Sequence, residues 1–421
     1  MLSTVVRRPS ALPAATIIFR SLTTETYSES SSHDVPPPPP PKRPLSTPRS
    51  LYPSPRRADA NESHLVHAGL PNLPPRFGRN QLLPVSNSTR ALMESIVGEF
   101  GAPIRYAFAY GSGVFEQDGY PAKVDGEAPM LDFMFAVTHA AHFHSINMQQ
   151  HPGHYTLHAK MLGSSYVSNM QDIGPGVWFN AYIPMAGVTI KYGVTTVDNL
   201  CADLLNWRTL YLAGRMHKPL RIIKDDARVR LTQQVNLTSA VRAALLTLPP
   251  EFSETQLFER VAGISYRGDP RMLLPAENRG KVANMVRRQT PQFKELYYRL
   301  VVGLPGVHWP AHLGTIQQDT SPHARAAHLK KLPANLLGAV KRNYDRTGKT
   351  PAYEADESAY WVRLAGDERL AATIDAELKR IVRYAATIQS LKGVVSAGVG
   401  KSVRYGAAKV GKWWNGGRAT S

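Results

Sequence analysis

The stretch AYGSGVFEQDG, residues 109–119, decides the fold because it follows an apolar run with two glycines around a serine. Gly111 and Gly113 allow the backbone to approach a ligand closely, and consecutive amides before a helix start can bind phosphate oxygens. Ser112 adds a hydroxyl donor, and Tyr110 precedes the turn. A strand that ends in Gly-Ser-Gly is more often an ordinary tight turn, so the phosphate interpretation requires a metal ligand nearby.

Asp132 is the candidate metal ligand. It interrupts the apolar run MLDFMFAV, residues 130–137, where a carboxylate is expected only if it is paired or binds a cation. A strand carboxylate after a glycine-serine turn resembles the nucleotidyltransferase superfamily, in which it holds magnesium against the triphosphate. Met134 stands where that superfamily usually has a second carboxylate. The alternative is an acidic residue on an exposed edge strand.

Candidate phosphate-binding cations follow in the sequence. Lys191 lies in the apolar run GVTIKYGV, residues 187–194, where a lysine is unexpected unless its stem packs and its ammonium meets an anion. Arg215 and Lys218 lie in the segment GRMHKP, just after a predicted helix. They either contact phosphate or complement the C-terminus of that helix. His217, between them, is expected to be a surface residue.

The periodicity predicts a sheet with helices packed on it. Short aromatic or β-branched runs, bounded by glycine, proline or polar residues, predict strands, and MAG marks a hairpin between the last two. The predicted strands cover residues 104–110, 130–137, 177–183 and 187–194. Asp198 is expected to cap a helix that Gly214 ends. Beyond about residue 232 the pattern becomes helical, with a capping box at Ser253 and Gln256.

The composition indicates an anionic partner. The chain of 421 residues has 50 lysines and arginines against 32 acidic residues, a net charge of +18. Nine of these cations, and no acidic residue, lie between Leu378 and Ser421. The single cysteine, Cys201, excludes an internal disulfide and a cysteine-based zinc knuckle. No run approaches the roughly 18 to 20 apolar residues of a membrane-spanning helix, so any membrane contact is expected to be peripheral.

The N-terminal region is expected to lie outside the folded domains. The first 24 residues contain Arg7, Arg8 and Arg20 and no acidic residue, which suits a mitochondrial transit peptide; a disordered start is the alternative. The following segment contains PPPPPP and is expected to be a disordered or polyproline spacer.

The predicted fold class is α/β (α+β), with a mixed sheet in the first domain and helices in the second. The expected organisation is a transit peptide (1–24), a proline-rich segment (25–85), a nucleotidyltransferase domain (86–230), a smaller, helical, winged-helix-like domain (231–345), a variable region (346–389) and a basic amphipathic tail (390–421).

The tail is a candidate membrane-binding element. Residues 390–414 place apolar side chains on one helical face and lysines mostly elsewhere, which suits the interface of an anionic bilayer. The candidate membrane-binding residues are Lys392, Lys401, Lys409, Lys412, Trp413 and Trp414. Five glycines weaken this helix in water, so it is expected to fold on the membrane. A disordered basic tail is the alternative.

Six histidines between residues 139 and 158 raise a zinc hypothesis, because His154 and His158 have a spacing that suits one helix face. Without a cysteine or a surrounding acidic motif, zinc is the weaker interpretation of this stretch.

An ordered series of motifs resembles one family. It consists of YGSGVF (110–115), MLDFMFAV, HSINMQQHPGHY (144–155), IKYGV, DLLNWRTLYLAGRMHKP (203–219) and AGISYRGDPRM (262–272). The series is similar to the mitochondrial CDP-diacylglycerol synthases, also called mitochondrial translocator assembly and maintenance proteins. The resemblance covers roughly residues 90–345, is weak in the tail, and leaves residues 1–85 and about 345–375 outside.

The resemblance implies a magnesium-dependent phosphatidate cytidylyltransferase that converts CTP and phosphatidic acid into CDP-diacylglycerol and pyrophosphate, for cardiolipin and phosphatidylglycerol synthesis. It implies a peripheral position on the matrix side of the mitochondrial inner membrane. The implied nucleotide-binding residues are Tyr110, Gly111, Ser112, Gly113 and Arg215, and the implied catalytic residues are Asp132, which also binds the metal, Lys191 and Lys218. The resemblance places residues 144–155 near the nucleotide and leaves the roles of Asp269 and Arg271 open.

Two other function classes stay open. An RNA-directed nucleotidyltransferase would share the turn and the aspartate, and the basic charge could bind a nucleic-acid backbone. The sequence has no base-stacking aromatic motif, so no nucleic-acid partner is expected. A non-enzymatic assembly factor of the inner-membrane translocation machinery would not need Asp132. The sequence leaves the oligomeric state open.

Overall fold

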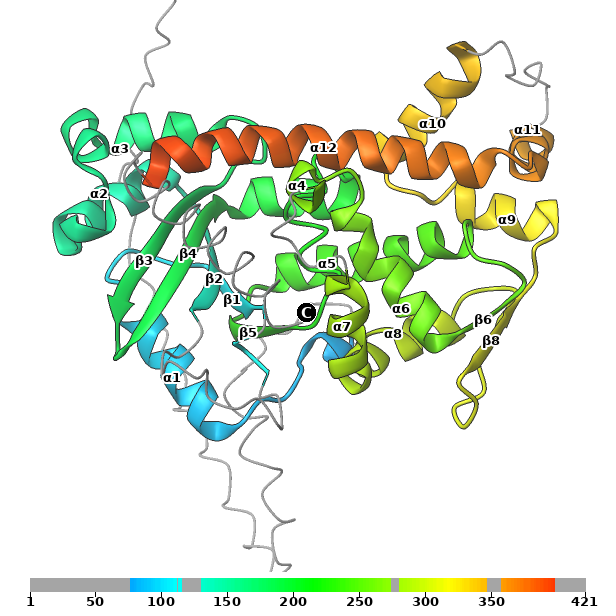
Figure 1. Cartoon of the computed structure of the whole chain (residues 1–421), viewed down its shortest axis with the longest axis horizontal. Helices are drawn as coiled ribbons and strands as arrows, with labels where there is room; N and C mark the ends of the chain where they lie inside the picture. Colours follow the sequence, from blue (N-terminus) through cyan, green and yellow to red (C-terminus); the bar gives the residue numbers. More distant parts are fainter. Residues whose placement is uncertain (1–75, 112, 116–129, 274–279, 347–356, 398–421) are drawn as a thin grey trace, which may run out of the picture. The chain divides into compact units, whose positions relative to one another are not determined.

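The computed structural model describes residues 76–111, 113–115, 130–273, 280–346 and 357–397 (Figure 1). All of these residues belong to one compact unit, residues 58–421. A five-stranded mixed sheet carries helices on both faces, and a second sheet has three strands. The predicted α/β fold class is therefore confirmed, whereas the division into a nucleotidyltransferase domain and a winged-helix-like domain stays a prediction.

The larger sheet has the strand order β3-β4-β2-β1-β5, and β2 and β4 run parallel while the other neighbours run antiparallel. Its strands are β1 (Tyr106–Tyr110), β2 (Leu131–Val137), β3 (Trp178–Met185), β4 (Val188–Thr196) and β5 (Leu220–Lys224). The four predicted strands are present, and β5 was not predicted. The hairpin between β3 and β4 turns at Ala186 and Gly187, both with positive φ, as a tight two-residue hairpin requires.

Helices make up most of the remaining described chain. They are α1 (Asn87–Gly98), α2 (Ala140–Gln150), α3 (Leu157–Asp172), α4 (Val197–Asn206), α5 (Ala227–Leu245), α6 (Glu254–Gly263), α7 (Lys281–Arg288), α8 (Thr290–Val302), α9 (Pro322–Leu329), α10 (Ala334–Arg346), α11 (Glu357–Gly366) and α12 (Leu370–Ala397). Short 3-10 helices are η1 (Arg79–Gln81), η2 (Pro152–His154), η3 (Ile264–Tyr266) and η4 (Pro270–Leu273). The smaller sheet joins β6 (Glu251–Ser253), β8 (Thr315–Gln318) and β7 (Val307–His308). The capping box of Ser253 and Gln256 is present at the start of α6.

Alternation along the strands sends side chains into two separate cores. Phe108 and Met134 belong to the core that includes α4 and α5, whereas Phe133, Phe135 and Tyr192 belong to the core that includes α1 and α2. The first core continues through α6 and α8 as far as α12. The candidate active site lies at the edge of this first core, on the same face of the sheet.

The helix that the sequence predicted between Asp198 and Gly214 is shorter than expected. Its N-cap is Thr196, and it ends at Trp207, which has a left-handed backbone with φ of 52°. The prediction was wrong because Asp203 is buried and its carboxylate accepts hydrogen bonds from the amides of the next turn. These donors are the backbone amides of Thr209, Leu210, Leu212 and Ala213. The bonds hold the chain in consecutive turns instead of a longer helix.

Three predicted segment boundaries differ from the structure. Asn80 and Leu83, assigned to the proline-rich spacer, are buried, and Asn80 Nδ2 donates to the Leu296 carbonyl at 2.8 Å. This contact with α8 holds the end of the spacer against the folded unit. The boundary predicted near residue 230 falls inside α5. The first residues of the tail predicted from residue 390 continue α12, which begins at Leu370, and the tail from residue 398 onward lies outside the described residues.

Candidate active site

Three adjacent strands place Tyr110, Asp132 and Lys191 side by side. Asp132 on β2 pairs with Tyr110 on β1 and with Lys191 on β4. Lys191 Nζ lies 3.5 Å from Asp132 Oδ1 and 4.7 Å from the centre of the Phe179 ring on β3. The sheet register therefore brings together three of the residues that the sequence singled out.

The Asp132 carboxylate has unused capacity for a ligand. Its Oδ1 is buried and accepts no hydrogen bond from the residues that the structure describes. A Cβ at Gly111 would lie 3.6 Å from Asp132 Oδ2, and Gly111 has φ of 94°, a conformation that favours glycine. A buried carboxylate oxygen without a donor, beside bare backbone, fits the ligation of a cation. Met134, two residues on, is buried in the core, so β2 supplies one carboxylate to this face.

The glycine-serine turn is described only in part. Gly113 is half-buried, whereas Ser112 and residues 116–129 lie outside the described residues. The predicted phosphate-binding roles of Ser112 and of the amides that follow it stay predictions.

Lys191 is held in its charged form. Burial lowers the pKa of Lys191, but Tyr110 and Asp132 outweigh burial and raise this pKa overall. The lysine is therefore protonated at neutral pH, with its ammonium between an acidic group and an aromatic ring.

Arg215 reaches the same face from the turns after α4. Its Nη1 donates to the Tyr211 carbonyl at 2.6 Å, and its guanidinium lies 3.8 Å from the centre of the Tyr211 ring. It is 5.8 Å and 5.9 Å from the ring centres of Tyr110 and Phe179. Arg215 and Lys191 thus share Phe179 as a neighbour, which concentrates positive charge beside Asp132.

Lys218 belongs to a second group of cations. Its Nζ donates to the Ser265 hydroxyl at 2.7 Å and lies 4.8 Å from the centre of the Tyr266 ring. Lys281 Nζ is 5.4 Å from the centre of the same ring. Burial, followed by the charges of Arg215 and Lys281, lowers the pKa of Lys218 well below its usual value. An anion bound among these cations would offset their mutual repulsion.

Asp269 orients Arg271, which answers a question that the sequence left open. Asp269 is buried, and its carboxylate accepts hydrogen bonds from the amide and the guanidinium of Arg271, the shortest at 2.7 Å. Burial raises the pKa of Asp269, but hydrogen bonds and charge from Arg271 outweigh burial and lower this pKa overall, and the hydrogen bond from Asp269 raises the pKa of Arg271; the charge of Arg215 acts weakly on both groups. The Arg271 side chain is 49% exposed, which leaves part of its guanidinium available to a ligand.

The sequence reasoning missed several aromatic and polar neighbours of these cations. They are Phe179, Tyr211, Ser265, Tyr266 and Lys281. Tyr211 lies four residues before Arg215, and Ser265 and Tyr266 lie in the motif AGISYRGDPRM, so proximity to known candidates was a usable signal. Phe179 and Lys281 had no signal in the sequence, because their contacts depend on tertiary structure.

The histidine-rich stretch lies on the opposite side of the sheet from Asp132. Tyr192 follows Lys191 in β4 and points to the other face, where its hydroxyl is 2.8 Å from His154 Nδ1. His144 is buried, and its two ring nitrogens contact Tyr155 and Gln171. The structure therefore does not bring this stretch to the Asp132 face, and its placement near the nucleotide stays a prediction. Within the described ranges, no three His, Cys, Asp or Glu side chains gather as a metal site.

His217 is not a surface residue. It is fully buried, its Nε2 lies 2.9 Å from Asn236 Oδ1, and burial lowers its pKa to about 3. The expectation was wrong because the turn that carries Arg215 also packs His217 against Trp207 and against Asn236 of α5.

Lys392 is not an exposed cation either. It is buried, and its Nζ donates to the carbonyls of Gln171 and Ile173 at 2.8 Å and 2.7 Å. The prediction that it binds membrane lipid was wrong for this lysine, because α12 docks it against the end of α3. The other candidates, Lys401, Lys409, Lys412, Trp413 and Trp414, lie outside the described residues. None of the described helices is long and apolar enough to span a bilayer.

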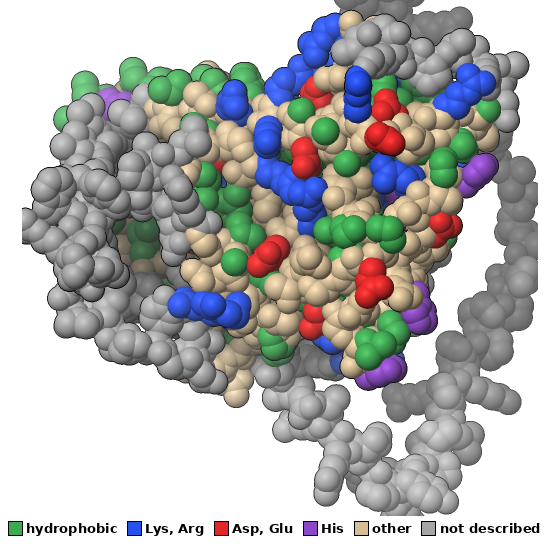
Figure 2. Space-filling model, turned by 45° about the vertical axis from the view of Figure 1, so that its right-hand side comes forward, with side chains coloured by type: hydrophobic (Ala, Val, Ile, Leu, Met, Phe, Trp, Pro, Cys, Tyr) green, Lys and Arg blue, Asp and Glu red, His purple; other side chains and the backbone are tan. Residues whose placement is uncertain are grey.

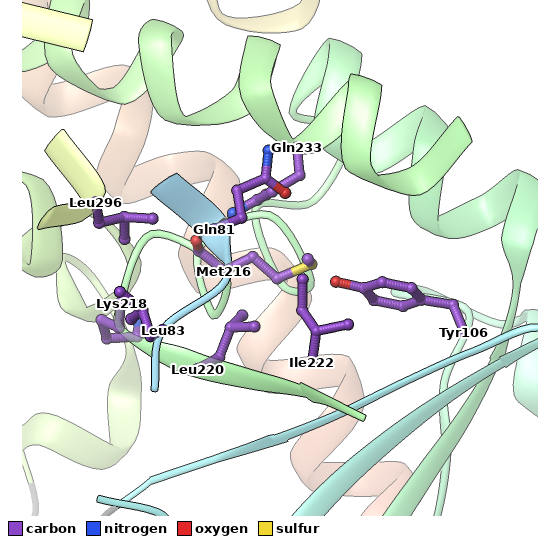
Figure 3. Close-up of a pocket in the computed structure, with 9 residues that line it drawn as sticks. All are labelled: Gln81, Leu83, Tyr106, Met216, Lys218, Leu220, Ile222, Gln233 and Leu296. Atoms are coloured by element: carbon purple, nitrogen blue, oxygen red, sulfur yellow. Dashed lines mark hydrogen bonds between the residues drawn. The ribbon is translucent and has the colours of Figure 1, made fainter. Parts of the chain in front are cut away.

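A small cavity lies behind Lys218 (Figure 3). It offers about 10 Å³ to the centre of a water molecule, which is room for one. Gln81 Oε1 and the Tyr106 hydroxyl are buried without a hydrogen-bond partner among the described residues, and both residues line this cavity. The cavity suits a bound water and is too small for a nucleotide.

Comparison with known proteins gives a consistent family. A family model described as mitochondrial phosphatidate cytidylyltransferase matches residues 93–412, without the gap that the sequence resemblance left at about 345–375. The Xenopus laevis mitochondrial phosphatidate cytidylyltransferase is 39% identical over 333 residues, which cover 78% of this chain and 96% of that protein. The Saccharomyces cerevisiae protein of the same name is 33% identical over 341 residues, covering 80% of this chain and 74% of that protein. The chain therefore belongs to the mitochondrial phosphatidate cytidylyltransferase family, and it is a nucleotidyltransferase enzyme.

Proposed function

We propose that this chain transfers the cytidylyl group of CTP to the phosphate of phosphatidic acid, giving CDP-diacylglycerol and pyrophosphate. The observation that carries the proposal is the convergence of the unsatisfied Asp132 oxygen with Lys191 and Arg215 at one edge of the sheet. A partly exposed carboxylate with one buried oxygen, beside cations, suits a metal-bound polyphosphate. The names of the relatives support the choice of substrates.

The triphosphate would lie between Gly111 and the two groups of cations. Gly111 lets the backbone approach the phosphates, and Arg215 presents a guanidinium whose position is fixed by Tyr211. Lys218 is fixed by Ser265 and regains a favourable charge when an anion binds. Arg271, oriented by Asp269, would bind the remaining phosphate charge.

Asp132 is the residue that would hold magnesium. Magnesium keeps several waters and takes phosphate oxygens as ligands, so one protein carboxylate suffices to position it. When bound, the ion would neutralise part of the negative charge of the triphosphate. Lys191, 3.5 Å from the same carboxylate, limits its orientation and adds a cation on the nucleotide side.

The transfer requires little acid or base catalysis from the protein. A phosphate oxygen of phosphatidic acid attacks the α-phosphorus of CTP, the bond to the β-phosphate bridge breaks, and pyrophosphate leaves. A phosphomonoester has a second pKa of about 6, so it is already mostly dianionic at neutral pH. Lys191, Arg215 and Lys218 would therefore act by aligning two anions and relieving their repulsion.

The proposed setting is the matrix side of the mitochondrial inner membrane, with peripheral attachment through the basic tail. There the product would supply the synthesis of phosphatidylglycerol and cardiolipin. Support comes from the mitochondrial names of the relatives and from the cations and tryptophans at the end of the sequence.

The test is the incorporation of labelled CTP into lipid by purified full-length protein, with magnesium and phosphatidic acid in vesicles. Asp132→Asn keeps the shape of the side chain and removes its charge; Asp198→Asn is the matched control, because Asp198 is exposed and pairs with Arg228. We expect labelled CDP-diacylglycerol from the parent and the control, and at least about a thousandfold less from Asp132→Asn. A folded parent that makes no labelled lipid would exclude the proposed function, and an active Asp132→Asn would exclude the metal assignment.

A further inference from the structure

Three exposed apolar side chains lie together at the start of α3. Leu157, Met161 and Leu162 are 70%, 78% and 58% exposed, and we call them the α3 patch. Among the described residues, the other large hydrophobic side chains that are more than half exposed are Tyr384 and Leu391, both on α12. Exposed apolar side chains that are clustered along a chain segment are a feature of protein or membrane interaction sites.

The backbone explains why the α3 patch faces outward. Gly163 has φ of 81° and ψ of 178°, which interrupts the helix directly after the patch. Leu157 and Met161 are four residues apart and share one side of the first turns, while Ala159 faces the interior. The first turns of α3 thus form a separate short segment with its apolar side exposed.

The charge around the α3 patch suits an anionic surface. No aspartate or glutamate occurs between Asp132 and Asp172, a stretch that forms α2, η2 and most of α3. The exposed Lys160 lies within the patch segment. A negatively charged surface can therefore approach α3 without meeting carboxylates on these elements.

The C-terminal part of α12 lies beside the end of α3. Lys392 on α12 donates to the carbonyls of Gln171 and Ile173, at the end of α3, and Gly174 lies against Ile388 of α12. Figure 1 shows the end of α12 next to α3, and hydrophobic side chains gather along the upper left edge of the view in Figure 2, the side of α3 in Figure 1. The chain beyond α12 contains lysines, arginines and two tryptophans and no acidic residue.

We propose that the α3 patch inserts into the surface of an anionic bilayer, so that the folded unit has its own apolar anchor beside the electrostatic one in the tail. The choice of a bilayer rests on the proposed function, which requires access to a lipid substrate. The absence of acidic residues between Asp132 and Asp172, and the composition of the sequence that follows α12, favour anionic lipid over a second copy of the chain or another protein.

The first test compares vesicle binding by full-length variants. Leu157, Met161 and Leu162 are replaced together by glutamine, which keeps the helix but removes the apolar surface. The control replaces Leu231 and Val235 on α5 by glutamine in the same way, because these two side chains are also exposed and four residues apart. The probes are vesicles of phosphatidylcholine alone or with phosphatidylglycerol, over a series of salt concentrations.

Salt separates the two anchors. Salt screens the contribution of the tail and leaves apolar insertion intact, so the parent and the control are expected to keep measurable binding at high salt. The α3 variant is expected to bind at least about tenfold more weakly, because insertion of even one leucine-sized side chain is worth about tenfold in partitioning. Equal binding by all three proteins at every salt concentration would overturn the proposal.

The second test reads the environment of the α3 patch directly. Cys201 is buried, and burial raises the pKa of its thiol, so Met161→Cys provides a cysteine that a polarity-sensitive dye labels selectively. The emission of the dye is expected to shift to the blue with phosphatidylglycerol vesicles, and a dye at Val235→Cys is expected not to shift. A vesicle-bound protein whose dye at residue 161 still reports water would exclude insertion. A blue shift without vesicles that grows with protein concentration would assign the patch to self-association instead.

A third measurement separates this proposal from the proposed function. Short-chain phosphatidic acid is soluble, so its turnover does not require membrane binding. The α3 variant is expected to match the parent on this substrate and to be slower on vesicles. If the parent turns over neither substrate but its dye at residue 161 enters the bilayer, the proposed function is excluded and the membrane anchor at α3 is retained.

Discussion

Lys191 and Tyr192 are neighbours in β4, yet they face two different environments. The Lys191 side faces Asp132 and Arg215, with a carboxylate oxygen that lacks a donor among the described residues and cations that lower the pKa of Lys218. The Tyr192 hydroxyl accepts hydrogen bonds from Asn147 Nδ2 and Asn180 Nδ2, each at 2.8 Å. The Lys191 face carries charged side chains that a ligand can bind. The Tyr192 face is a network of neutral polar groups that are hydrogen-bonded to one another.

The two faces of the sheet are expected to serve different purposes, ligand binding on the Lys191 face and stability on the Tyr192 face. Like charges held close together cost free energy in the folded protein, and an anionic ligand bound among them recovers that cost. A buried, hydrogen-bonded network stabilises the fold and leaves little capacity for a ligand. Substitutions on the Lys191 face should therefore change turnover, and substitutions on the Tyr192 face should change the free energy of unfolding.

The largest effect is expected from Lys191→Met. Removal of the cation beside Asp132 should lower kcat by about a hundredfold to a thousandfold if the proposed phosphate role is correct, as removal of other charge-stabilising donors does. Lys191 is partly exposed, so the free energy of unfolding should change by less than about 1 kcal/mol. Steady-state kinetics and urea unfolding check the two values. Unchanged kcat would refute the assignment of this face to catalysis.

Gly268→Ala tests the segment that carries Asp269 to the Lys191 face. Gly268 has φ of 74°, and a Cβ there would overlap the Lys379 carbonyl of α12. Strain and overlap together should lower the free energy of unfolding by about 2 to 3 kcal/mol, and should slow turnover by displacing Arg271. Gly263→Ala is the control, because its helical backbone and open surroundings predict no loss. Equal stability of both variants in chemical denaturation would contradict the tight packing of Gly268 against α12.

Tyr192→Phe should have a smaller effect, confined to stability. It removes the oxygen that accepts from Asn147 and Asn180 and leaves two buried donors unpaired, at a cost of about 2 kcal/mol in the free energy of unfolding. Turnover per folded molecule should equal that of the parent. A fall in kcat without a loss of stability would show that the two faces are coupled.

The smallest effect is the pH dependence contributed by His144. Burial lowers the pKa of His144 to about 4, so the unfolded chain takes up a proton below about pH 6.5 and the folded protein does not. The unfolded state then binds more protons, and stability falls as the pH falls through this window. Between pH 7 and 5.5 the parent should lose about 1 kcal/mol more than His144→Gln. Parallel stability curves would show that His144 takes up its proton at the same pH in the folded and the unfolded protein.

The sequence predicted the local parts of the fold well and the long-range contacts poorly. Strands with clear alternation and the Ser253 capping box were found because their signals lie within a few residues. β5 was missed although Pro219 and Asp225 bound its short, β-branched run LRIIK. The early end of α4 was missed because it depends on Asp203, a buried carboxylate that binds amides several residues away.

The candidate site was predicted in the same uneven way. Asp132 and Lys191 stood out because charged residues interrupt apolar runs, and β2 and β4 pair them in register. The arrangement of Arg215 over Tyr211, and of Lys218 with Ser265, depends on turns that no periodic pattern encodes. The position of the histidine-rich stretch could not be read from the sequence, because it depends on the face of the sheet on which α2 and η2 pack.

The position of α12 sets an order of events for a newly made chain. Its buried residues belong to the same core as β1 and β2, although they lie more than two hundred residues later in the chain; they are Leu370, Ile374, Leu378, Val382 and Ala385. A chain that emerges N-terminus first, from a ribosome or through a membrane pore, cannot complete this core until α12 has followed. Until then the apolar surface that α12 covers is exposed to aggregation, and a chaperone that binds apolar segments would hold the chain until its last helix arrives.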